Sequence, residues 1–125
     1  MPGKIFLIIG SIFGFLGVAI GAFAAHGLKT KLSVELFSIL EVGVRYHMYH
    51  ALALLLVSWA VSHAPIHWFP ISGWCFVAGI IIFSGSLYIL ALSGVKAWGA
   101  ITPIGGLFFL AGWLALAFGA FRLPQ

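Results

Sequence analysis

The segment IFLIIGSIFGFLGVAIGAFAA, residues 5–25, carries no charged residue over its whole length. A helix needs about 20 apolar residues to cross the hydrocarbon core of a bilayer, so this segment predicts a membrane-spanning helix. Three further apolar stretches follow, at about 42–62, 70–92 and 102–121. Backbone groups in lipid must find hydrogen-bond partners within their own segment, which favours helices here. We therefore predict one all-α domain over residues 1–125, a four-helix transmembrane bundle with short loops.

Composition supports the same class of protein. Apolar residues make up 63% of the chain and charged residues 6%, against about 45–50% and about 25% in soluble domains. The net charge of +4 comes from cations scattered singly near the predicted helix ends. Nucleic-acid binding needs a continuous basic face, so no nucleic-acid partner is predicted. The expected partner is the lipid bilayer.

The second predicted helix differs from the other three. From residue 34 to about residue 62 it would be about 44 Å long, at 1.5 Å per residue. That length exceeds a hydrocarbon core of about 30 Å. Its first part, residues 34–44, is amphipathic. This part is predicted to be an interfacial segment that continues, or bends, into the span.

Small residues are predicted to form the contacts between helices. In lipid no hydrophobic force drives helices together, and small side chains allow the close backbone approach that gains dispersion contacts. Packing within the bundle is the favoured interpretation, and a seam between identical subunits on the first or fourth span is the alternative. The predicted packing residues are Gly10, Gly14, Gly17, Gly21, Ser84, Gly85, Ser86, Gly106, Ala111, Ala115 and Gly119.

Polar residues cluster where the second helix enters the membrane. Ionisable residues within membrane spans are costly and are functional hypotheses by default. Glu41 and Arg45 are spaced i, i+4, which favours an interfacial ion pair in which Arg45 extends to the headgroups. The alternative is a buried pair that binds an anionic headgroup or relays protons. The predicted binding residues are His26, Glu41, Arg45, Tyr46 and His50.

His47 and His50 lie on a different arc of the same helix from Arg45, at 100° per residue. Their i, i+3 spacing suits a shared metal, but a zinc site needs at least three protein ligands and no matching set is present. We therefore expect no metal and no cofactor, and favour hydrogen bonding of these rings to other helices. His26, at the end of the first span, is predicted to meet His50 or Arg45.

Several segments resemble the DUF423 family of small membrane proteins, also called UPF0382. The matching segments are GAFAAHG at 21–27, YHMYHALA at 46–53, FSGSLY at 83–88, TPIGG at 102–106 and AGW at 111–113. The resemblance implies a four-span bacterial inner-membrane protein with no established activity. The positions that fall on the family pattern are His26, His50, Ser84, Gly85, Ser86, Thr102, Pro103 and Gly106. The family usually has Gln at position 47, which argues against His47 as an obligatory ligand.

The sequence contains no catalytic motif, and this decides the expected function. No nucleophile–base set or phosphate-binding loop is found, so the chain is not expected to be an enzyme. We expect a small accessory or scaffold subunit with a homo-oligomer or membrane-protein partner. The alternative is a carrier or binder of a small molecule, a lipid headgroup or a proton at the entrance of the second helix. The distribution of Lys and Arg predicts the first and third loops in the cytoplasm and both termini outside.

Overall fold

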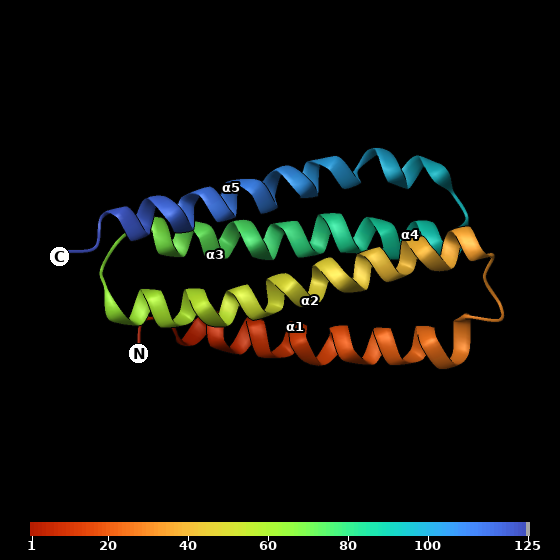
Figure 1. Cartoon of the computed structure of the whole chain (residues 1–125), viewed down its shortest axis with the longest axis horizontal. Helices are drawn as coiled ribbons and strands as arrows, with labels where there is room; N and C mark the ends of the chain where they lie inside the picture. The colour runs from red at the N-terminus through yellow and green to blue at the C-terminus, as the bar shows by residue number, and fades with distance from the viewer. Residues whose placement is uncertain (125) are drawn as a thin grey trace.

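The computed structural model describes residues 1–124 as four long helical rods. The first rod is α1 (Lys4–Phe23), extended by a π-helical turn, η1 (Ala24–Leu28), and the second is α2 (Val34–His63). The third consists of α3 (Trp68–Gly79), the π-helical turn η2 (Ile80–Ser84) and α4 (Gly85–Ser93). The fourth is η3 (Lys96–Ala100), a 3₁₀ turn, followed by α5 (Thr102–Phe121). Successive rods run in opposite directions, which brings both termini to the same end of the molecule (Figure 1).

Local sequence explains where the helices begin and end. The Ser33 hydroxyl accepts a hydrogen bond from the Leu36 amide at 3.2 Å, which caps the start of α2. Gly94 ends α4 in the left-handed conformation, with φ of 71°. Pro103 lies in the first turn of α5, where a missing N–H costs nothing.

Three of the rods are long and apolar enough to cross a membrane by length and composition: residues Lys4–Leu28, Trp68–Ser93 and Lys96–Phe121. α2 does not meet the same test of apolarity. It nevertheless joins the C-terminal end of the first rod to the N-terminal end of the third, and these two rods run in the same direction (Figure 1). α2 must therefore cross back, and the fold is a four-helix transmembrane bundle.

α2 lies between the first and third rods, and its polar residues include the buried His47, His50 and Ser58. It packs against α1, α3, η2 and α4. Its amphipathic first part is continuous with the rest of the helix, and Leu40 on that part packs with Ala24 and Ala91. The apolar side of residues 34–44 is thus covered by the bundle, while Glu35 and Ser38 on the other side stay exposed.

Three glycines of α5, spaced seven residues apart, each pack against a phenylalanine of the third rod. A Cβ added at any of these glycines would run into a phenylalanine, so the helices are in close contact along the whole seam. The pairs are Gly105 with Phe83, Gly112 with Phe76, and Gly119 with Phe69. Because α5 is antiparallel to the third rod, the two series run in opposite directions. A repeat of seven is the spacing that keeps one face of a helix on its partner.

The predicted packing ridges differ in part from this seam. Gly10, Gly17, Ala115 and Gly119 are buried. Ala111 is exposed, and a Cβ at Gly14 or Gly85 would meet nothing within 4 Å. The prediction of packing within the bundle is wrong at those three positions. At Gly14 and Ala111 the i+4 spacing drifts away from the face that the seven-residue spacing maintains, whereas Gly85 lies between the buried Ser84 and Ser86 and faces away from the contact.

Candidate functional site

His47 joins three helices. Its Nε2–H donates to the carbonyl oxygen of Phe13 on α1 at 2.8 Å, since a carbonyl only accepts. Its Nδ1 then accepts from the hydroxyl of Tyr88 on α4 at 2.9 Å. Gly17 allows this approach, because a Cβ there would come within 3.3 Å of the His47 ring and collide with Met48. Both ring nitrogens of this buried histidine therefore have protein partners.

His50 joins α2 to α5. The indole N–H of Trp113 donates to His50 Nε2 at 3.0 Å, and indole nitrogen is only a donor. The proton of His50 therefore sits on Nδ1, which donates to the Tyr46 carbonyl at 2.7 Å. The ring also stacks on Phe109, with 3.6 Å between centroids. The expectation that these histidines hydrogen-bond across helices is confirmed.

Buried serines extend the same kind of link. The Ser84 hydroxyl, placed by the π turn η2, donates to the Gly43 carbonyl at 2.7 Å. The hydroxyls of Ser86 and Thr102 lie 2.6 Å apart and connect α4 to α5. Ser72 is the exception within residues 1–124, because its buried hydroxyl oxygen has no partner.

The chain start is attached to α2 in a way that sequence reasoning missed. The Ser58 hydroxyl donates to the Gly3 carbonyl at 2.8 Å, and the Gly3 amide donates to Ser62 at 3.2 Å. A Cβ at Gly3 would collide with the carbonyl oxygen of Ser58. The signal available in the sequence was a pair of serines at i, i+4 in an otherwise apolar span.

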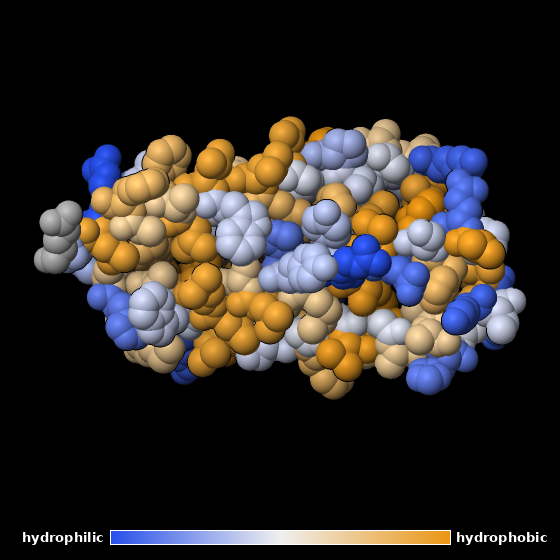
Figure 2. All heavy atoms as spheres, in the orientation of Figure 1, coloured by the Kyte–Doolittle hydropathy of each residue, from blue (hydrophilic) through white to orange (hydrophobic). Residues whose placement is uncertain are grey.

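The predicted polar site is divided between two grooves. Glu41 and Arg45 are both exposed and line a groove of about 270 Å³ against Gly21, Ala24 and Ala25. The space-filling view shows hydrophilic side chains over α2 within a largely apolar face (Figure 2).

Tyr46 and His50 line a second groove, of about 370 Å³, against α5. Tyr46 is 40% exposed, and its ring contacts those of His50 and Phe83. His26 is exposed on η1 and lines neither groove. The predicted meeting of His26 with His50 is not formed, since the His50 ring is enclosed by Tyr46, Phe76, Phe109 and Trp113.

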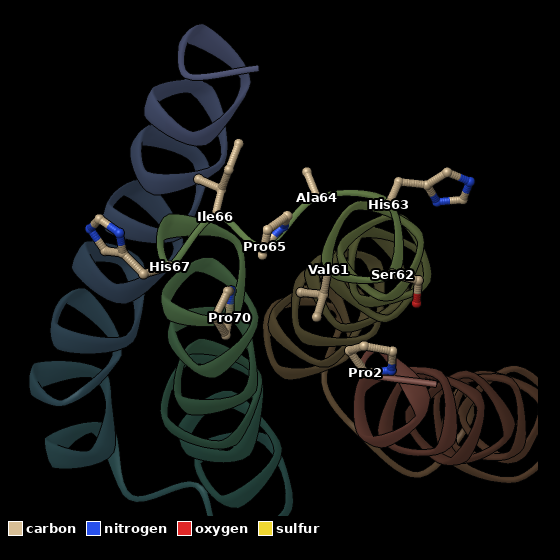
Figure 3. A pocket seen from close by; sticks show the side chains of 9 residues that line it. All are labelled: Pro2, Val61, Ser62, His63, Ala64, Pro65, Ile66, His67 and Pro70. Atoms are coloured by element: carbon tan, nitrogen blue, oxygen red, sulfur yellow. The ribbon is translucent and has the colours of Figure 1, made fainter. Parts of the chain in front are cut away.

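A third hollow, of about 360 Å³, lies at the end of the bundle that holds the termini. Its lining includes Pro2, Pro65 and Pro70. The rings of His63 and His67 extend away from it in different directions (Figure 3). No set of polar side chains converges there, so the two α2 grooves remain the candidates.

The sequence model described as "Protein of unknown function (DUF423)" matches residues 20–106. This chain belongs to the DUF423 family. A UPF0382 membrane protein of Staphylococcus haemolyticus is 45% identical, covering 95% of this chain and 97% of the relative. The UPF0382 membrane protein YwdK of Bacillus subtilis is 42% identical, covering 95% and 98%. The UPF0382 inner membrane protein YgdD of Escherichia coli is 40% identical, covering 100% and 95%. No solved structure matches the chain.

The DUF423 match includes α2 and both walls of the groove at Glu41 and Arg45. Residues 20–106 contain the groove residues Gly21, Glu41 and Arg45, together with His47 and His50. The matched region ends within the first turns of α5, so Trp113, the partner of His50, lies outside it. This DUF423 chain is a multi-pass membrane protein whose polar side chains are concentrated on one helix.

Proposed function

We propose that this DUF423 protein is a small accessory or scaffold subunit that acts through its lipid-facing helix faces. The observation that supports this most is the use of the buried polar groups. Both ring nitrogens of His47 and His50 are occupied by protein partners. General acid–base chemistry needs a group within reach of a substrate proton. Neither histidine has a ring nitrogen left over for that role. What the bundle presents outward is apolar surface.

The outer faces of α1 and α5 suit a partner helix as well as lipid. Phe15 on α1 is 72% exposed and Phe118 on α5 is 53% exposed. Both are large side chains outside the packed core, so a photo-reactive phenylalanine analogue at either position would leave the fold intact. Helix association in membranes depends on close packing of such faces, with no hydrophobic force to assist.

The test is photo-crosslinking in native membranes. The full-length protein would carry the photo-reactive analogue at Phe15 or, in a second variant, at Phe118. Irradiation is expected to give a protein adduct of defined mass from at least one face, with a matched unirradiated sample as control. If both positions yield only lipid adducts, and the protein isolated in native membrane patches is always a lone monomer, the scaffold function is refuted.

A second candidate function is favoured by the groove at Glu41 and Arg45. An exposed anion and an exposed cation share one wall of this groove, one helical turn apart. Such a wall suits a small ligand with charged groups, and a binder or carrier of such a ligand is the corresponding function. Native mass spectrometry of the purified protein tests it: an adduct pattern that is the same in the wild type and in Arg45→Gln would eliminate it.

A further inference from the structure

We propose that the Glu41–Arg45 groove binds the headgroup of a phospholipid that carries a primary ammonium group. In this arrangement Arg45 binds the phosphate and Glu41 binds the ammonium. The inference rests on the second candidate function and names the chemical class of its ligand. Three observations support it: the depth of the groove, the order of its charges and the shape of its opposite wall.

The depth of the groove in the membrane can be measured from the opposite end of the bundle, where the termini lie. Lys4 and His63 mark that end, and the Gly3–Ser62 hydrogen bond holds the two helices level there. A hydrocarbon core of about 30 Å corresponds to about 20 helical residues. Counting 20 residues along α1 from Lys4 reaches Ala24, which packs against Leu40 of α2. Glu41 therefore lies at the boundary between hydrocarbon and headgroups, and the Arg45 side chain, which starts about one helical turn deeper, is long enough to reach that boundary.

The order of the charges matches that of a phospholipid. Glu41 is nearer the loop that joins η1 to α2, and Arg45 lies about 6 Å deeper along the helix axis. In a phospholipid the phosphate is attached next to the acyl chains and the amine is attached beyond it. The phosphate thus comes level with the guanidinium of Arg45, and the ammonium with the carboxylate of Glu41. Guanidinium is well suited to phosphate because its N–H groups pair with two oxygens.

The opposite wall of the groove is built from small residues. Gly21, Ala24 and Ala25 face the longer side chains of α2 and leave the space of about 270 Å³. The last two belong to η1, where the helix widens to a π turn, and such turns are often found at functional sites. Phe37 and Val44 add apolar surface on the α2 side. A headgroup fits between these walls while its acyl chains continue along the lipid-facing surface.

The charge pair also decides between alternative occupants. A purely anionic headgroup, or a partner helix with one acidic residue, would satisfy Arg45 and leave the Glu41 carboxylate facing a like charge. A choline headgroup has the same net charge as ethanolamine but has no N–H to donate to Glu41. Comparing these two headgroups therefore isolates the Glu41 contact.

The experiment is native mass spectrometry of the full-length protein with phosphatidylethanolamine, phosphatidylcholine or phosphatidylglycerol of identical acyl chains. We expect the ethanolamine adduct to exceed the choline adduct by roughly threefold, the range of one exposed charge pair. Glu41→Gln is expected to bring that ratio to about one, and Arg45→Gln to reduce the adducts of all three lipids. Glu35→Gln and Arg122→Gln are matched controls outside the groove and are expected to leave the ratio unchanged.

Each outcome has one meaning. If Arg45→Gln lowers all adducts while Glu41→Gln changes no ratio, the groove binds phosphate and the ethanolamine assignment is refuted. If neither variant changes any adduct, the second candidate function fails as well. Preferred binding of phosphatidylglycerol by the wild type would also overturn the proposal. Circular dichroism of each variant confirms that the helices remain, because both side chains are exposed. The scaffold function is tested separately by the crosslinking at Phe15 and Phe118.

Discussion

Alanine at Gly105, compared with alanine at the adjacent Gly106, tests the seam between α5 and the third rod. A Cβ at Gly105 would collide with the backbone nitrogen of Phe83 and lie 2.7 Å from its Cα. A Cβ at Gly106 would meet only the Phe83 ring, at 3.9 and 4.0 Å. A backbone cannot turn aside as a side chain can, so Gly105→Ala must displace α5 from its partner.

The magnitude follows from two opposing effects. Replacing Gly by Ala inside a helix stabilises it by about 1 kcal/mol, and this gain is common to both variants. Overpacking a close contact costs about 1–3 kcal/mol, and only Gly105→Ala incurs it. We therefore expect Gly105→Ala to be less stable than Gly106→Ala by about 1–3 kcal/mol. Reversible unfolding in mixed micelles, followed by circular dichroism, measures this difference. Equal unfolding midpoints would refute the proposed geometry of the seam.

A second pair of variants shows whether the colliding group is backbone or side chain. At Gly112 the added Cβ would lie 2.6 Å from Phe76 ring atoms. Phe76→Leu should therefore relieve part of the cost of Gly112→Ala, with a coupling energy of about 0.5–3 kcal/mol in a double-mutant cycle. Phe83→Leu should not relieve Gly105→Ala, because the obstacle there is the main chain. Rescue at both positions, or at neither, would contradict the reasoning.

Three further predictions concern the polar links, and the same unfolding assay checks each of them. Trp113→Phe removes the donor to His50 and should cost about 1 kcal/mol, whereas Trp59→Phe, at a residue that is 56% exposed, should cost under about 0.5 kcal/mol. His47→Gln should stay close to wild type, since the Gln amide can donate and accept in the same two directions, and His47→Leu should lose about 1 kcal/mol. Ser84→Ala should lose about 1 kcal/mol with its hydrogen bond to α2, whereas Ser72→Ala should lose nothing, because its hydroxyl has no partner.

The architecture was predictable because it depends on residue type alone. Long apolar runs separated by short polar segments require helices that span the bilayer. α5 begins and ends at residues 102 and 121, where the fourth apolar stretch was placed. The π turns were not predictable, since each inserts one residue into a helix without a marker in composition. The turn at η2 places Ser84 on the Gly43 carbonyl, which lies 41 residues away in sequence.

The candidate site was predicted less well because contacts between helices were inferred from how deep each residue lies in the membrane. The sequence does not show which helices are neighbours at that depth. His26 and the polar turn of α2 are at similar heights, which suggested a contact. The i, i+4 geometry of α2 directs Glu41 and Arg45 outward, while His50 is directed toward α5. Knowing which neighbour lies on which side of a helix requires the order of helices around the bundle. One sequence does not provide that order, because its glycines occur at both four-residue and seven-residue spacings and these indicate different helix faces.

The position of α2 explains why its polar groups divide into two classes. Polar side chains on the faces of α2 that pack against other helices cannot reach water or headgroups, so each must be satisfied by the protein. His47 and His50 follow this rule with two protein partners each. Glu41 and Arg45 lie on the one face that the bundle leaves open, next to a groove. Charges near the hydrocarbon boundary are stabilised by pairing with each other or with lipid headgroups. A ligand of this DUF423 protein should therefore be sought in the open groove between η1 and the exposed face of α2, and not in the packed interior of the bundle.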